Sequence, residues 1–127
     1  MGASGSICDK KIYYLSSEKD KSYDFLALLN NYVSSISHLL VSEIKECNII
    51  ILSISENMLS DYNQCNAIHY AEENNVPILF ICLDENFNPQ SHNALKKVMK
   101  NYSCCYTEGD LNLTIKKINS YISSFNL

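Results

Sequence analysis

Two uninterrupted apolar runs, NIIILSIS at residues 48–55 and VPILFICL at residues 76–83, constrain the fold of this chain more than any other feature. Continuous runs of this length, rich in β-branched residues, are typical of strands that are buried on both faces of a parallel sheet. Neither run is long enough to cross a membrane as a helix, which takes about 20 apolar residues. We therefore predict that both runs are central strands of a parallel sheet.

The segments around these runs alternate between strand patterns and helix patterns. Residues 11–17 and 103–107 are short strand candidates, and residues 32–37 are at most an edge strand. Apolar residues recur at helical spacing between these strands. The expected helices lie at 25–33, with Asp20 or Ser22 as its cap, at 38–47, at 61–74, around Leu95–Met99, and after a cap at Asp110.

Strands that alternate with helices in a chain of 127 residues predict a doubly wound α/β fold. We expect a flavodoxin-like, three-layer sandwich with a parallel sheet of about five strands in the order 2-1-3-4-5. Right-handed crossovers place helices on both faces of such a sheet. Residues 11–127 form this domain, and residues 1–10 form a flexible N-terminal segment.

The composition excludes two kinds of partner. All ten basic residues are lysines and the formal net charge is -4, whereas nucleic-acid binding requires a basic surface and uses arginine for bidentate contacts. The six cysteines form no C-x-x-C pair and have no spacing that suits zinc. We therefore expect no nucleic acid, no metal and no cofactor, and reduced cysteines in a cytoplasmic protein.

Polar residues follow the predicted strands at the edge where doubly wound sheets bind ligands. Ser16 and Ser17 end the first strand, and Ser53 lies near the end of the first long apolar run. These three serines are candidate cofactor-binding residues, and the alternative is that they only cap strand ends. No glycine-rich loop follows any strand, so the sequence has neither a P-loop nor a dinucleotide-binding fingerprint.

Three stretches together resemble the TIR (Toll/interleukin-1 receptor) domain family. IYYLSSEKD at 12–20 is similar to the first box of the family, and VPILFICL matches a later strand. EIKECNIIILSISENMLSDYNQCNAIHYA at 43–71 looks like its most recognisable stretch, in which Ser60, Tyr62 and Cys65 loosely match the S-x-W-C motif. The resemblance covers the chain from about residue 11 to the end, and it implies an intracellular signalling module of the kind used in innate immunity.

The departures from the family pattern concern catalysis and pairing. TIR domains that cleave NAD use a glutamate three residues after the cysteine, and Ile68 occupies that position here. Glu72, one helical turn further along, is the only candidate catalytic acid. The long second-box loop, which covers the nucleotide pocket and mediates domain contacts in the family, is missing, and the third box is not evident.

Three functions remain open from these observations. The first is a non-catalytic TIR-like adaptor or decoy, whose partner is a protein such as another TIR domain. Its expected contact surface is the outer face of the 61–74 helix, formed by Tyr62, Asn63, Asn66, His69 and Tyr70. The alternative is an NAD⁺ hydrolase that uses Glu72, with Ser16 or Ser53 lining its pocket. The third is a Rossmann-like domain with an unnamed ligand.

The first residues, MGASGSICDK, match the pattern for N-myristoylation at Gly2. One acyl chain binds membranes only marginally, so a second signal is needed, and palmitoylation of Cys8 would supply it. These two residues predict a membrane surface as a partner, at its cytoplasmic face. The alternative is that GASGS is a linker introduced by cloning.

Overall fold

The two apolar runs form the centre of a four-stranded parallel sheet, β2 (Ile49–Ile54) and β3 (Ile78–Cys82), in which every residue is buried. The computed structural model describes residues 10–84, 87–89 and 101–125. β1 (Ile12–Ser16) pairs with β2 and β4 (Tyr102–Tyr106) pairs with β3, so the order is β1-β2-β3-β4. The prediction that both runs are central strands is confirmed.

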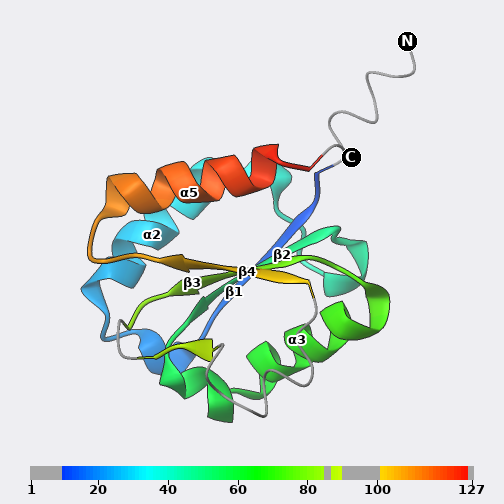
Figure 1. Cartoon of the computed structure of the whole chain (residues 1–127), viewed down its shortest axis with the longest axis horizontal. Helices are drawn as coiled ribbons and strands as arrows, with labels where there is room; N and C mark the ends of the chain where they lie inside the picture. Colours follow the sequence, from blue (N-terminus) through cyan, green and yellow to red (C-terminus); the bar gives the residue numbers. More distant parts are fainter. Residues whose placement is uncertain (1–9, 85–86, 90–100, 126–127) are drawn as a thin grey trace.

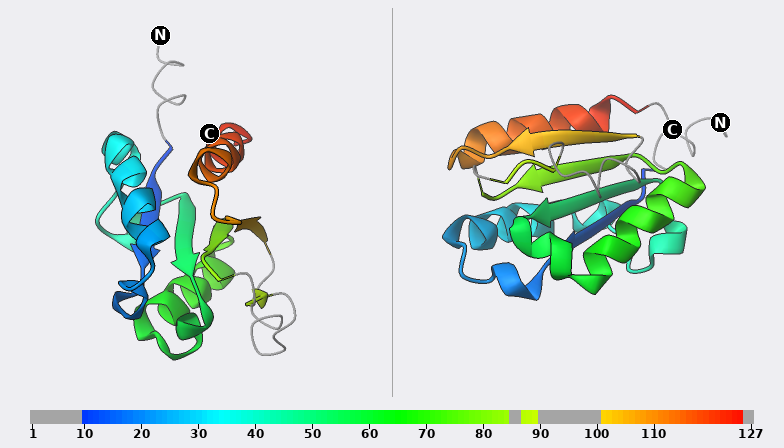
Figure 2. Two further views of the ribbon diagram at one scale, coloured as in Figure 1. Left: turned by 90° about the vertical axis from the view of Figure 1, so that its left-hand side faces the viewer. Right: turned by 60° about the horizontal axis from the view of Figure 1, so that its bottom comes forward.

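Helices cover the two faces of the sheet, as Figure 1 and the right panel of Figure 2 show. α2 (Asp24–Ser35) and α5 (Leu111–Ser123) lie on one face, and α3 (Tyr62–Asn74) lies on the other. Alternate residues of each strand point to opposite faces, which divides the core in two. Ile49 and Ile51 pack with α2 and α5, whereas Ile50 and Leu52 pack on the α3 side. The expected three-layer, flavodoxin-like α/β fold is confirmed.

The prediction of a fifth strand at residues 32–37 is wrong. Tyr32 lies in the last turns of α2, where its hydroxyl donates to Asn119 of α5, and η2 (Ser37–Leu39) follows. The next residues keep a trace of the expected edge strand. Leu40 forms an isolated parallel bridge with Ile12, and the Val41 amide donates to the Ile12 carbonyl at 2.9 Å. This bridge lies beside β1, where the order 2-1-3-4-5 places the second strand.

The helix expected at 38–47 is also absent, and η2 and η3 (Ile44–Glu46) stand in its place. The bridge to β1 holds Leu40 in an extended conformation (φ -83°, ψ 142°), which interrupts the helical spacing of the apolar residues. Long-range pairing to the sheet edge therefore overrides the local pattern. The short helix expected around Leu95–Met99 lies outside the described residues.

The helix ends are partly as expected. Asp61 and Asp110 cap α3 and α5, where their carboxylates accept from the amides of Gln64 and Leu113. Asn75 ends α3 in the left-handed conformation. The expected caps of α2 are wrong, because this helix begins after Tyr23 without a side-chain cap. Asp20 is instead buried in η1 (Glu18–Asp20).

Candidate functional site

The carboxyl edge of the sheet, which faces the viewer in the left panel of Figure 2, contains a buried carboxylate. Asp20 is 0% exposed, and its Oδ1 accepts from the Ser55 hydroxyl at 2.6 Å and from the Asn57 amide group at 2.9 Å. Its second oxygen, Oδ2, has no hydrogen-bond partner among the described residues. Ser55 also accepts from the Asn57 backbone amide and so caps η4 (Glu56–Ser60). These contacts join the turn after β1 to the turn after β2.

A second set of bonds joins the same two turns. The Ser17 hydroxyl donates to Asp61 Oδ2 at 2.5 Å, and the Lys19 ammonium donates to the carbonyl and hydroxyl oxygens of Ser60 at 3.0 and 2.8 Å. Gln64, fully buried at the start of α3, donates to the Ser53 carbonyl at 2.7 Å. The carboxyl ends of β1 and β2 are therefore closed by side-chain bonds.

The charge at this edge is mainly negative. Among the described residues, its acidic side chains are Glu18, Asp20, Asp24, Glu56, Asp61, Asp84, Glu108 and Asp110. Its basic side chains are Lys19, Lys21 and Lys117, whose ammonium donates to the Tyr106 carbonyl at the end of β4 at 3.2 Å. Lys21 pairs with Glu18. Burial, and then the charges of Asp84 and Asp20, raise the pKa of the Tyr23 hydroxyl. An edge with this charge repels a bare phosphate group.

A small hollow of about 270 Å³ lies beside the end of β1. It is lined by Ser16, Ser17, Glu18, Lys21, Leu26, Ala27 and Asn30. The predicted cofactor residues Ser16 and Ser17 thus line one hollow. Ser53 is fully buried behind them, where its hydroxyl lies 2.8 Å from that of Tyr14, which in turn donates to Asn30 at 2.9 Å. Burial raises the pKa of Tyr14, so this hydroxyl stays protonated.

Glu72 lies far from these serines. α3 runs antiparallel to the strands, and Glu72 lies in its last turns, shortly before the chain enters β3. At 1.5 Å per residue, it is about 15 Å along the helix from Tyr62. Ser16 and Ser53 lie at the carboxyl edge, and Glu72 lies toward the amino edge. The structure does not bring the candidate acid to the candidate pocket.

The position of the family glutamate is part of the core. Ile68 is 2% exposed and packs in the cluster that contains Phe80 and Ala71. Cys65, on the same helix, donates to the Met58 carbonyl at 3.3 Å. Burial and the neighbouring Asp61 raise the pKa of the Cys65 thiol, which disfavours the thiolate that a nucleophile requires.

Most of the predicted contact surface on α3 lines one groove. Asn63, Asn66, His69 and Tyr70 form one wall of a groove of about 380 Å³, together with Ala67 and Glu73. Tyr13 of β1 and Ile44 of η3 form the opposite wall, which the sequence did not reveal because it comes from distant segments. Tyr62 lies outside the groove and is 75% exposed.

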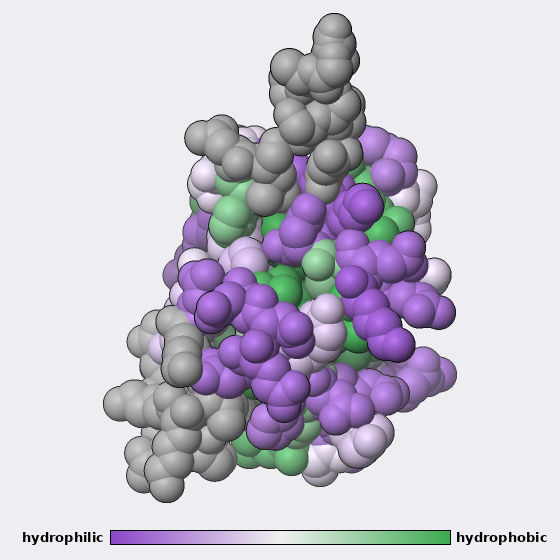
Figure 3. Space-filling view, turned by 90° about the vertical axis from the view of Figure 1, so that its right-hand side faces the viewer, coloured by the Kyte–Doolittle hydropathy of each residue, from purple (hydrophilic) through white to green (hydrophobic). Residues whose placement is uncertain are grey.

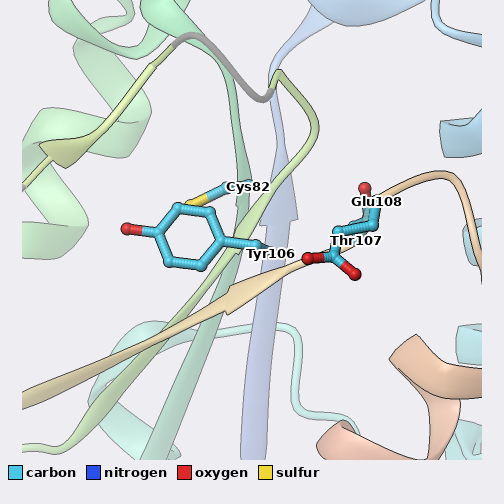
Figure 4. Close-up of a pocket in the computed structure, with 4 residues that line it drawn as sticks. All are labelled: Cys82, Tyr106, Thr107 and Glu108. Atoms are coloured by element: carbon cyan, nitrogen blue, oxygen red, sulfur yellow. The ribbon is translucent and has the colours of Figure 1, made fainter.

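A further pocket, missed by the sequence analysis, lies at the ends of β3 and β4. It has a volume of about 410 Å³ and is lined by Cys82, Tyr106, Thr107 and Glu108. Cys82 lies beside the ring of Tyr106, and Thr107 and Glu108 lie on the other side of the pocket (Figure 4). The hydrogen bond with Cys104, and then burial, raise the pKa of Cys82, and burial raises the pKa of Tyr106 to about 12. Neither group supplies an acid or a base near neutral pH.

The remaining predictions concern membranes, metals and lipids. No helix within residues 10–84, 87–89 and 101–125 is long and apolar enough to span a membrane. Across the same residues, no three His, Cys, Asp or Glu side chains are grouped so that they could hold a metal ion. The candidate lipidation residues Gly2 and Cys8 lie outside the part of the chain that the structure describes.

Comparisons with protein-family models, with curated proteins and with solved structures gave no match.

Proposed function

We propose that the chain is a non-catalytic TIR-like interaction module in intracellular signalling, acting as an adaptor or as a decoy that blocks one. The observation that carries the proposal is the hydrogen bonding between two of the stretches on which the resemblance is built. Asp20 belongs to the first and Ser55 to the second, and both are fully buried in contact with each other. The bond from Ser17 to Asp61 joins the same two stretches.

The geometry gives no support to the alternative of an NAD⁺ hydrolase. That reaction needs a carboxylate next to the nucleotide pocket, and the family position for it is the buried Ile68. Glu72 lies toward the opposite edge of the sheet from the hollow that Ser16 and Ser17 line. A protein-binding role requires only an accessible surface, and the groove along α3 offers one.

The N-terminal motif adds a location to the proposal. The chain enters the sheet at its amino edge through Lys10 and Lys11, and this edge, seen in Figure 3, carries mainly hydrophilic residues. Acylation of Gly2, with Cys8 as the second site, would hold this edge at the cytoplasmic face of a membrane. The two lysines would add about 1 kcal/mol each on an anionic surface.

The experiment combines a catalytic and a binding measurement on the purified chain. NAD⁺ consumption is followed by chromatography at high protein concentration for the wild type and for Glu72→Ala. Binding of the wild type to a panel of purified TIR domains is followed by interferometry up to about 100 μM. We expect no NAD⁺ consumption above a protein-free blank, and binding to at least one domain of the panel.

Matched variants test which surface binds. Asn66→Arg places a bulky charge in the groove wall, so binding should weaken at least tenfold. Glu18→Arg changes an exposed residue at the carboxyl edge and should leave binding unchanged. NAD⁺ turnover that disappears in Glu72→Ala would make the protein an enzyme, and a panel without any binding partner would contradict the interaction module.

A further inference from the structure

Helices α3 and α5 carry opposite charges on opposite sides of the sheet. α3 contains Glu72 and Glu73 and no basic residue other than His69, whereas α5 contains Lys116 and Lys117 and no acidic residue. The sheet separates the two helices, as Figure 1 shows. The domain is therefore polarised across its three layers, and one outer surface complements the other.

The acidic side has a groove with a partly apolar lining. Tyr13, Ile44, Ala67 and Tyr70 contribute apolar surface to its walls, and Glu73 also lines it. The segment that carries Ile44 also bears exposed charges, which are Glu43, Lys45 and Glu46. Both walls thus have a net negative charge, and the groove favours an apolar side chain flanked by cations.

The basic side presents such a group. Leu113, Lys116, Lys117 and Ser120 follow one another at i, i+3, i+4 and i+7, which places them on one stripe of α5. All four are exposed, and Leu113 is among the few large apolar residues of the described chain that remain 36% or more exposed. The Lys117 ammonium donates to the Tyr106 carbonyl at 3.2 Å, so Lys116 is the cation of the stripe that is available to a partner. The opposite stripe, with Thr114, Ile118 and Ile122, is buried against the sheet.

We propose that the groove along α3 binds the α5 stripe of a second copy of this chain. Leu113 of one copy packs on the apolar part of the groove lining, and Lys116 lies beside Glu73 of the other. The inference deepens the proposed function, on which it rests, because it gives the α3 surface a partner and assigns a binding role to the exposed face of α5.

The position of the two surfaces determines the assembly. Each copy uses a different surface from its neighbour, so the contact is heterologous, and the two surfaces face away from each other. After one contact forms, each copy keeps one free surface, so association continues into open chains. Exposed ion pairs contribute little and are screened by salt. The association is therefore weak, is detectable at high protein concentration, and decreases as salt is added.

Charge reversal tests the pairing directly. The average molar mass is measured by analytical ultracentrifugation from about 10 μM to about 1 mM in low salt. For the wild type we expect a mass that rises with concentration beyond that of a dimer. Glu73→Lys and Lys116→Glu alone should each weaken association at least tenfold. The double variant, in which both charges are reversed and again complementary, should recover association to within about threefold of the wild type.

A matched control separates specific pairing from net charge. Glu18→Lys changes the formal charge from -4 to -2, as Glu73→Lys does, but at the carboxyl edge, so it should associate like the wild type. A wild type that stays monomeric throughout, a Glu73→Lys variant that associates normally, or an equal loss in Glu18→Lys would each overturn the pairing. The NAD⁺ and panel-binding results are independent of these outcomes, so the proposed function can stand when the pairing fails.

Discussion

Replacing Ser55 by alanine tests the bond that joins the first two turns at the carboxyl edge. The Ser55 hydroxyl donates to Asp20 at 2.6 Å and accepts from the Asn57 amide at 3.1 Å, and both Ser55 and Asp20 are fully buried. After the change, Asp20 keeps one hydrogen bond, of 2.9 Å from the Asn57 side chain, and its Oδ2 has no partner in the described part of the chain.

The expected cost follows from the two bonds that are lost. A hydrogen bond to a charged group contributes about 1.5–3 kcal/mol. Loss of a helix cap costs about 1 kcal/mol, and less for a short 3₁₀ turn such as η4. We therefore expect Ser55→Ala to lower the free energy of unfolding by about 2–4 kcal/mol. For a domain whose total stability is about 5–15 kcal/mol, this is a large loss.

Urea denaturation followed by circular dichroism measures this change. Ser34→Ala is the control, because the Ser34 hydroxyl donates to the Asn30 carbonyl on an exposed face of α2, and its loss should change stability by less than about 0.5 kcal/mol. A double-mutant cycle with Asp20→Asn should show a coupling of at least about 1 kcal/mol between Ser55 and Asp20. A Ser55→Ala loss as small as that of the control would refute the reasoning.

Two further predictions concern a thiol and two left-handed residues. Burial raises the pKa of the Cys47 thiol to about 11. At pH 8, alkylation of Cys47 by iodoacetamide should therefore be roughly a hundredfold slower in the folded protein than in urea. Mass spectrometry should give an alkylation rate whose pH profile has its midpoint near pH 11, and a midpoint near pH 9 would contradict the prediction. Because the unfolded chain loses this proton first, stability should fall as the pH rises from about 9 to about 11. Asn75 and Gly109 have φ angles of 55° and 74°. In thermal melts, Asn75→Gly should raise the stability of the fold by up to about 1 kcal/mol. Gly109→Ala should lower it by about 1–2 kcal/mol through backbone strain alone, because the added Cβ meets nothing within 4 Å. An unchanged melting temperature in both variants would contradict this prediction.

The sequence predicted the parts of the fold that depend on local chemistry. The apolar runs became β2 and β3, and Asp110 caps α5 as predicted. The region from 32 to 47 was predicted wrongly. There, helix and strand patterns overlap, and contacts with distant segments decide between them: Tyr32 bonds to α5, and Leu40 bridges to β1.

The candidate site was predictable in place but not in detail. Their position at the end of a predicted strand identified Ser16 and Ser17, and both line the hollow beside β1. The neighbouring sequence does not indicate that Tyr14 covers Ser53. Asp20 has the spacing of a helix cap, and its burial depends on Ser55, 35 residues away. The groove along α3 likewise needs Tyr13 and Ile44, which the helical pattern alone does not locate.

The hydrogen bonds between the turns after β1 and β2 limit where this domain can present a functional surface. Doubly wound sheets ordinarily bind ligands at this edge, between the turns that follow neighbouring strands. Here the turns after β1 and β2 are bonded to each other through Ser17, Asp20 and Lys19. A ligand that enters between these turns would have to break these hydrogen bonds, of which the one from Ser55 to Asp20 is buried. Breaking them costs more than a weakly held ligand returns. The outer faces of α3 and α5 need no such opening, so contacts with another protein can form there without any change in these turns.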